Sequence, residues 1–211
     1  MSGLALDSRR VSAGTLFFAL PGEKEDGGDF IAEAMARGAV CAVCEQPPEG
    51  ERPYILVPDA HKALALCAAV WYGTPAGKMT LVGVTGTNGK TTTTYLIKQI
   101  LERARSTRVG LIGTNQNLIG DKVVPTDRTT PDALTVQRLL AQMADAGCAY
   151  AVMEVSSHAL MQSRVAGIHF RVGVFTNLTQ DHLDYHGTME AYCDAKSRLF
   201  DQCGIACVNG D

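Results

Sequence analysis

The sequence of 211 residues lacks a hydrophobic run long enough to cross a membrane. Its longest apolar run, residues 63–72, has about half of the roughly 20 residues that a membrane-spanning helix needs. The first ten residues include Asp7, Arg9 and Arg10 and lack the apolar core of a secretory signal. We therefore expect a cytoplasmic protein with no membrane insertion.

An excess of one charge is also absent, since 19 lysines and arginines stand against 22 aspartates and glutamates, a net charge of −3. This balance disfavours a nucleic-acid partner but leaves room for a small anionic ligand, which needs only a local site. Hydrophobic residues make up 46% of the chain, which is typical of a folded protein and excludes a largely disordered one.

A disulfide framework is not indicated, because the seven cysteines are odd in number and mostly lie in apolar segments. Cys41 and Cys44 form a C-x-x-C pair, but they lie in a strand-like run where residues three apart point to opposite faces. We predict that these two cysteines, like Cys203 and Cys207, pack in a core rather than bind a metal or carry redox chemistry.

What the sequence does have is an alternation of strand-like and helix-like segments. The helix-breaking residues 73–77 divide it into two α/β blocks, which we assign to residues 1–76 and 77–211. Helices between strands predict mostly parallel sheets with right-handed crossovers. We expect strands at residues 16–20, 40–44, 54–57, 80–84, 109–112, 150–155, 172–175 and 205–208, and helices at residues 29–37, 59–72, 90–103, 132–146 and 188–200.

Residues 83–92, G-V-T-G-T-N-G-K-T-T, lie between an apolar strand-like segment and an amphipathic helix-like one. Two glycines allow the backbone to curl so that its N–H groups and the positive helix end face phosphates. Lys90 is placed to bridge phosphate oxygens and the Thr91 hydroxyl to coordinate Mg²⁺, although Val84 stands where the strict P-loop motif has its first glycine. The segment predicts a nucleoside triphosphate site formed by Gly86, Thr87, Asn88, Gly89, Lys90, Thr91 and Thr92.

The spelling T-G-T-N-G-K-T resembles the Mur ligase family, the ATP-dependent amide-forming enzymes of peptidoglycan synthesis. Other segments match that family in the same order along essentially the whole chain: D-S-R at 7–9, T-T-P-D at 129–132, M-E-V-S-S-H at 153–158, N-L-T-Q-D-H-L-D at 177–184 and A-K at 195–196. The resemblance implies a uridine-binding first domain and an incomplete, P-loop-type ATPase domain. A third domain, which holds the incoming amino acid in this family, is missing, so we expect a fragment that is inactive alone.

The same resemblance implies roles for individual residues. Glu154 ends an apolar strand-like segment, where a buried carboxylate is costly unless it faces a cation. Together with Thr91, His182 and a carbamylated Lys196, it is expected to hold Mg²⁺, with two ions in all. Lys90, Glu154, His182 and Lys196 are the expected catalytic residues. Contacts to the substrate are implied for Ser8, Asn88, Thr129, Thr130, Ser156, Gln162 and Arg164.

The V-S-S-H segment resembles the branch of the family that adds the third stem-peptide residue to UDP-MurNAc-L-Ala-D-Glu through an acyl phosphate. ATP and an amino acid are then the other substrates, and we expect a monomer. A MurF-like or folylpolyglutamate synthetase-like ligase is an alternative, although the latter typically continues G-K-G-S where this chain has G-K-T-T. A non-catalytic nucleotide-binding module is another alternative, which the joint presence of Glu154, His182 and Lys196 disfavours.

Overall fold

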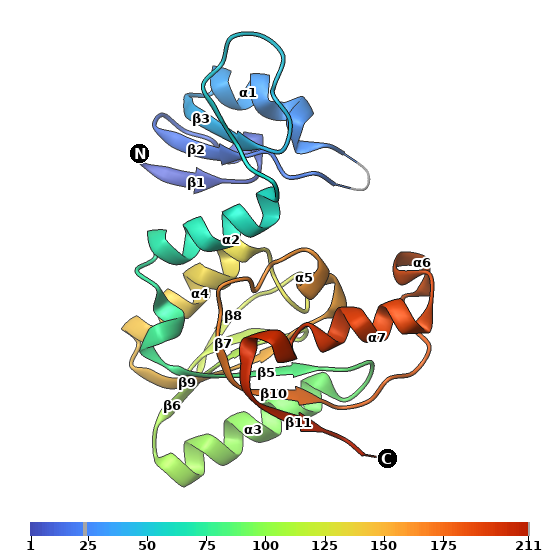
Figure 1. Ribbon diagram of the computed structural model, residues 1–211. Helices are drawn as coiled ribbons and strands as arrows, with labels where there is room; N and C mark the ends of the chain where they lie inside the picture. The colour runs from blue at the N-terminus through green and yellow to red at the C-terminus, as the bar shows by residue number, and fades with distance from the viewer. Residues whose placement is uncertain (23–24, 211) are drawn as a thin grey trace. The chain divides into compact units, whose positions relative to one another are not determined.

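The computed structural model describes residues 1–22 and 25–210 (Figure 1). The chain forms two compact units, Met1–Ala68 and Ala69–Asp211. Their boundary falls inside helix α2 (Ala60–Trp71), earlier than the boundary after residue 76 that the breaker residues 73–77 predict. Among the described residues, no helix has the length and apolar character needed to cross a membrane.

The first unit contains a parallel sheet whose described strands pair in the order β1-β2-β3-β4. Strand β1 is not expected from the sequence, because three residues are too few to show alternation. A short helix packs on the sheet and buries Phe17, Ile31 and Ala34. The elements are β1 (Gly3–Ala5), η1 (Ser8–Arg10), β2 (Thr15–Phe18), η2 (Gly27–Phe30), α1 (Ile31–Ala36), β3 (Ala39–Cys44) and β4 (Tyr54–Leu56).

The second unit contains a larger sheet whose described strands pair in the order β11-β10-β5-β9-β6-β7-β8. The pairs from β11 to β6 are parallel, which confirms the predicted class of mostly parallel α/β fold. The pairs from β6 to β8 are antiparallel and are not predicted, because short strands carry little periodicity. The strands are β5 (Thr80–Thr85), β6 (Arg108–Ile112), β7 (Asn117–Ile119), β8 (Lys122–Val124), β9 (Cys148–Glu154), β10 (Phe170–Phe175) and β11 (Cys203–Val208).

Helices cover both faces of this sheet because its central strands bury side chains on both sides. Leu81 joins the core beneath α4, whereas the next residue, Val82, joins the core beneath α3. The helices are η3 (Pro75–Lys78), α3 (Lys90–Arg105), α4 (Ala133–Asp145), α5 (Ser157–Met161), α6 (Leu183–His186), α7 (Met189–Ser197) and η4 (Phe200–Gln202).

Strand order places the loops of this unit at one edge. The chain leaves β5 through α3 and adds β6 and β9 on one side, and it later adds β10 and β11 on the other side. In open α/β sheets, ligands bind outside the carboxyl ends of the strands where the strand order reverses in this way. A site is therefore expected among the segments that follow β5, β6, β9 and β10.

The cysteine prediction is correct for Cys44 and wrong for Cys207. Cys44 is buried and Cys41, on the opposite face of β3, is half-buried, and burial raises the pKa of both thiols. Cys203 is half-buried against the larger core. Cys207 is exposed, because β11 is an edge strand whose side chains are mostly not packed into a core.

The core beneath α4 makes a testable prediction. Leu140 has no exposed surface, so Leu140→Ala is expected to lower the free energy of unfolding by about 2–5 kcal/mol, through lost burial and a residual cavity. Leu96→Ala is the matched control on α3, since that side chain is 53% exposed, and is expected to cost less than about 1 kcal/mol. Urea unfolding followed by circular dichroism measures both, and equal losses would contradict this placement of the core.

Candidate active site

The P-loop leaves the carboxyl end of β5 and leads into α3. Gly86 has φ of +135° and Gly89 has φ of +83°, both in the region that favours glycine. A side chain at position 86 would collide with the Thr176 hydroxyl and crowd the backbone of Asn177. Glycine at this position is therefore required both by backbone conformation and by the close approach of the segment after β10.

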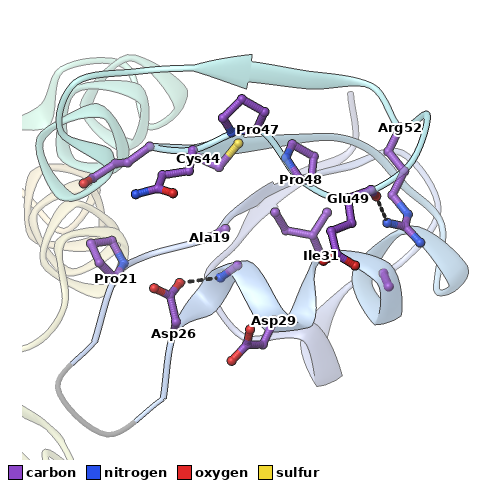
Figure 2. A pocket seen from close by; sticks show the side chains of 14 residues that line it. Ala19, Pro21, Asp26, Asp29, Ile31, Cys44, Pro47, Pro48, Glu49 and Arg52 are labelled. Carbon is purple, nitrogen blue, oxygen red and sulfur yellow. Dashed lines mark hydrogen bonds between the residues drawn. The ribbon is translucent and has the colours of Figure 1, made fainter.

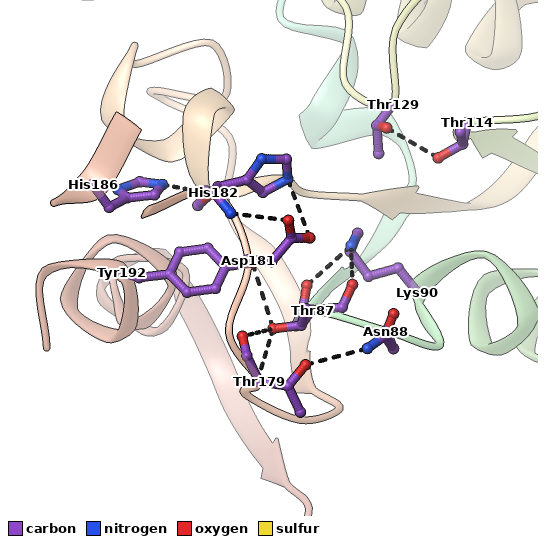
Figure 3. A network of polar contacts seen from close by, with 12 residues as sticks. Thr87, Asn88, Lys90, Thr114, Thr129, Thr179, Asp181, His182, His186 and Tyr192 are labelled. Carbon is purple, nitrogen blue, oxygen red and sulfur yellow. Dashed lines mark hydrogen bonds and ion pairs between the residues drawn. The ribbon is translucent and has the colours of Figure 1, made fainter. Parts of the chain in front are cut away.

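Hydrogen bonds from that segment hold the loop (Figure 3). The Thr87 N–H donates to the Asn177 carbonyl at 2.9 Å, and the Asn88 N–H donates to Asn177 Oδ1 at 2.9 Å. The Thr87 hydroxyl lies 3.1 Å from the Thr179 carbonyl and accepts from the Thr179 N–H at 3.0 Å. The loop is thus shaped by contacts with residues about ninety positions away in the sequence.

Two lysines converge on this loop. Lys90 Nζ donates to the carbonyls of Gly86 and Thr87 at 3.0 and 2.9 Å. Lys196 Nζ, from α7, donates to the same Gly86 carbonyl at 2.7 Å. A lysine on a helix would ordinarily face solvent, but Lys196 is only 1% exposed. The structure therefore brings together two lysines that lie more than a hundred residues apart.

Desolvation perturbs both amines. Burial lowers the pKa of Lys90, against the attraction of Glu154 and Asp181. Burial, together with the charge of Lys90, lowers the pKa of Lys196 to about 7, while Asp181 opposes the shift. The ring of Tyr192 lies 4.3 Å from Lys196 Nζ, measured to its centroid, and helps to bury the amine. Near neutral pH a large share of Lys196 is therefore the neutral, nucleophilic amine.

Glu154 ends β9 and has no exposed surface. Its carboxylate accepts from the Thr91 hydroxyl at 3.0 Å, from the Thr114 N–H at 2.9 Å and from the Thr114 hydroxyl at 3.0 Å. A buried carboxylate and an adjacent hydroxyl at the start of the P-loop helix are hard oxygen ligands of the kind that Mg²⁺ prefers. The donor set therefore fits a divalent cation.

Four of the residues expected to contact substrate form a second linked group next to Glu154. The Thr130 hydroxyl donates to the Glu154 carbonyl at 2.8 Å and accepts from the Ser156 N–H at 3.0 Å. Arg164 donates to the Thr130 carbonyl at 2.7 Å and, from two nitrogens, to Gln162 Oε1 at 3.1 and 2.6 Å. Burial lowers the pKa of Arg164, and Arg128 adds to the effect. The guanidinium remains a cation held in a fixed position.

Three other expected residues have different surroundings. Ser8 belongs to the first unit, where it is buried and its hydroxyl donates to Glu33 at 2.9 Å. His182 is the N-cap residue of α6 and has φ of +51°; its Nε2 lies 3.5 Å from Asp181 Oδ2, and its ring centroid lies 6.2 Å from that of Tyr192. Thr92 is exposed on the first turn of α3.

The sequence analysis missed several residues of this site. Thr114 directly follows the turn after β6, and a polar residue at a strand end is the signal that could have found it. Asp181 and Thr179 lie in the N-L-T-Q-D-H-L-D segment, in which only His182 was predicted to be a site residue. Nothing in the sequence marked Tyr192 as a site residue, because an aromatic residue on a helix usually packs in a core.

Each unit also has a cavity. In the first unit, a cavity of about 520 Å³ lies between the segments after β2 and β3, and acidic side chains predominate among the charged groups of its lining (Figure 2). In the second unit, a cavity of about 510 Å³ adjoins the first turns of α3. Its lining combines hydroxyl, amide and aromatic groups: Thr91, Thr92, Tyr95, Leu96, Gln99, Asn115 and Gln116.

The lowered pKa of Lys196 predicts a pH dependence of stability. The unfolded lysine, with a pKa of about 10.4, keeps a proton that the folded amine has lost above about pH 7. The free energy of unfolding should therefore rise between about pH 7 and 9.5 by roughly 1 kcal/mol per pH unit from this group. Lys196→Met removes that contribution, so denaturant unfolding of the two proteins should give diverging pH curves. Parallel curves would contradict the burial of the free amine.

Comparison with known proteins identifies the family. The Mur ligase middle domain pattern matches residues 84–211, and the pattern described as Mur ligase family, catalytic domain, matches residues 1–72. A UDP-N-acetylmuramoyl-L-alanyl-D-glutamate--2,6-diaminopimelate ligase of Geobacillus thermodenitrificans (strain NG80-2) is 52% identical over 95% of this chain and 41% of its own length. The ligase of the same name from Listeria monocytogenes serotype 4b (strain F2365) is 49% identical over 100% of this chain and 45% of its length. The chain thus spans less than half the length of these curated relatives.

Solved structures of Mur ligases also superpose on this chain. A structure of a ligase of that name superposes with a TM-score of 0.83 at 33% identity, covering 99% of this chain and 43% of that one. The MurF ligase from Thermotoga maritima, solved in complex with ADP, superposes with a TM-score of 0.63 at 25% identity, covering 99% of this chain and 45% of that one. The chain therefore belongs to the Mur ligase family.

Proposed function

We propose that the second unit binds ATP with Mg²⁺ at the P-loop. Three features support this proposal: the left-handed glycines, the free N–H groups expected at the start of α3, and Lys90 poised over the loop. Lys90 would leave the loop carbonyls to contact the phosphates. The cavity along α3 begins at Thr91 and Thr92 and offers Tyr95 and Asn115 to a nucleoside. The ADP complex of the Thermotoga maritima MurF ligase adds weight from a related protein.

We infer that Thr91 and Glu154 hold one Mg²⁺, and that His182 and carbamylated Lys196 contribute to a second. The bound ions supply positive charge that neutralises the phosphoryl oxygens. Carbamylation joins the neutral amine of Lys196 to the carbon of carbon dioxide and releases a proton, which leaves an anion. The pKa of Lys196, about 7, supports this reaction, because a protonated amine lacks the electron pair that forms the nitrogen–carbon bond.

We propose that the acceptor is UDP-MurNAc-L-Ala-D-Glu, with Ser8 on the uridine diphosphate part. Asn88, Thr129, Thr130, Ser156, Gln162 and Arg164 would contact the muramoyl-dipeptide and its phosphates. Arg164 supports this assignment, because Gln162 and Thr130 fix its guanidinium plane and a fixed guanidinium suits carboxylate and phosphate groups.

The complete reaction that we propose is that of a MurE-type ligase. The D-glutamyl carboxylate attacks the γ-phosphorus of ATP, the bond to ADP breaks, and an acyl phosphate forms. The amine of an amino acid then attacks the carbonyl carbon, phosphate leaves, and an amide remains. The names of the relatives support 2,6-diaminopimelate as that amino acid. The convergence of Lys90 and Lys196 on one carbonyl carries the proposal, since a simple nucleotide-binding module has no use for a second buried lysine.

Calorimetric titration tests the binding functions. The chain should bind a non-hydrolysable ATP analogue with Mg²⁺, and should prefer UDP-MurNAc-L-Ala-D-Glu over UDP-N-acetylglucosamine. Lys90→Met should weaken analogue binding by about 100-fold, because charge-assisted contacts to phosphate are worth roughly 1.5–3 kcal/mol. Lys78→Met, on an exposed lysine, is the control and should bind as the wild type does. Nucleotide binding without a substrate preference would favour the non-catalytic module.

Carbamylation has its own test. In carbon-13 bicarbonate near pH 8, the wild-type chain should give a carbamate carbon signal by NMR. That signal should disappear in Lys196→Met and persist in Lys62→Met, which alters an exposed lysine. The same signal in both variants would show that the modified amine is not Lys196.

A further inference from the structure

Glu154 depends on its hydrogen-bond donors more than an exposed carboxylate would. It has no contact with solvent, and a buried carboxylate without partners is strongly destabilising. One of its donors, the Thr91 hydroxyl, is also a proposed ligand of Mg²⁺ and would then turn its oxygen toward the ion. The donors that contact Glu154 both with and without bound Mg²⁺ belong to Thr114.

Thr114 contacts both carboxylate oxygens at once. Its N–H donates to Oε1 at 2.9 Å and its hydroxyl donates to Oε2 at 3.0 Å. Two contacts from a single residue fix the plane of the carboxylate as well as its position. The other lone pairs of the carboxylate are left to face the P-loop helix, where Thr91 lies.

The local backbone is built for this close approach. A side chain on Gly113 would collide with Glu154 Oε1, so the turn after β6 needs glycine at that position. The Gly113 N–H donates to Oδ1 of Asn117 at 3.3 Å, and Asn117 is 2% exposed at the start of β7. The unexpected antiparallel strands thus brace the turn that presents Thr114.

The Thr114 hydroxyl also contacts a third residue, Thr129. The Thr114 hydroxyl has one proton and lies 3.0 Å from both Glu154 Oε2 and the Thr129 hydroxyl. The Thr114 hydroxyl is the donor in both contacts, so its single proton is shared between the Glu154 carboxylate and the Thr129 oxygen. Thr129, Thr114 and Glu154 therefore form a hydrogen-bonded row in which Thr114 is the donor to both of its neighbours.

We propose that Thr114 is a positioning residue that holds the Glu154 carboxylate in the orientation that receives Mg²⁺, and that it links this carboxylate to Thr129. The proposal rests on the nucleotide and Mg²⁺ site proposed above. Through this row, a change at Thr129, on the segment assigned to the acceptor, reaches the cation site. Groups that orient a metal ligand in this way commonly contribute 10–100-fold to metal affinity.

The test measures how strongly Mg²⁺ promotes binding of a non-hydrolysable ATP analogue to the chain. Thr114→Val keeps the shape and the N–H but removes the hydroxyl, and should weaken the apparent Mg²⁺ affinity by about 10-fold. Analogue binding without Mg²⁺ should be unchanged, and Thr114→Ser should restore the Mg²⁺ dependence. Thr126→Val is the matched control, since its hydroxyl donates to the Arg128 carbonyl at 2.8 Å, outside the row.

A double-mutant cycle tests the link. Thr129→Val should strengthen the Mg²⁺ dependence, because the Thr114 proton then goes to Glu154 alone, and this change should disappear when Thr114→Val is also present. Unchanged Mg²⁺ affinity in Thr114→Val would overturn the proposal, as would an equal loss of binding with and without Mg²⁺. A wild-type chain that binds no analogue would instead overturn the proposed nucleotide site, and the inference with it.

Discussion

The carbonyl oxygen of Gly86 is the point on which the second unit depends. It accepts from Lys90 and from Lys196, so one backbone acceptor joins the P-loop, the helix that follows it and the distant helix α7. Two ammonium groups so close together repel each other, and burial removes the water that would screen them. The lowered pKa of Lys196 relieves that conflict, because a neutral amine can donate to the carbonyl without adding a second charge.

The sheet topology explains why such distant residues meet. Parallel strands deliver their carboxyl ends to one edge, so the P-loop after β5, Glu154 at the end of β9 and Asn177 after β10 become neighbours. The strand order reverses around β5, which gives the P-loop a different partner on each side. From β10 it receives hydrogen bonds that shape its backbone, and from β9 it receives a carboxylate. The chemical contrast between the two sides follows from that order.

Much of this arrangement is readable in the sequence, because it is carried by long apolar runs. The runs at β5 and β9 have clear ends, and the polar residues that follow them, the P-loop and Glu154, could be placed at a common edge. The strands β7 and β8 could not, since three residues show no reliable alternation. They extend the sheet with the opposite strand direction, which the helix-strand alternation does not anticipate.

Other features escape sequence reasoning because they arise from contacts between distant residues. The burial of Lys196 follows from packing against Gly86 and Tyr192, and nothing within α7 announces it. Thr114 matters through a carboxylate forty positions away. Cys207 shows the reverse error, since an apolar neighbourhood in the sequence suggests burial that an edge strand does not provide.

The enclosure of Lys196 has a consequence for its chemistry. Its amine is nucleophilic near neutral pH, yet with 1% exposure and an aromatic ring against it, the approach to nitrogen is narrow. The Lys196 amine is therefore reactive in its protonation state but poorly accessible to reagents. The packing that lowers the pKa of this amine thus also favours a small reagent over a bulky electrophile, in keeping with the carbamylation proposed for it.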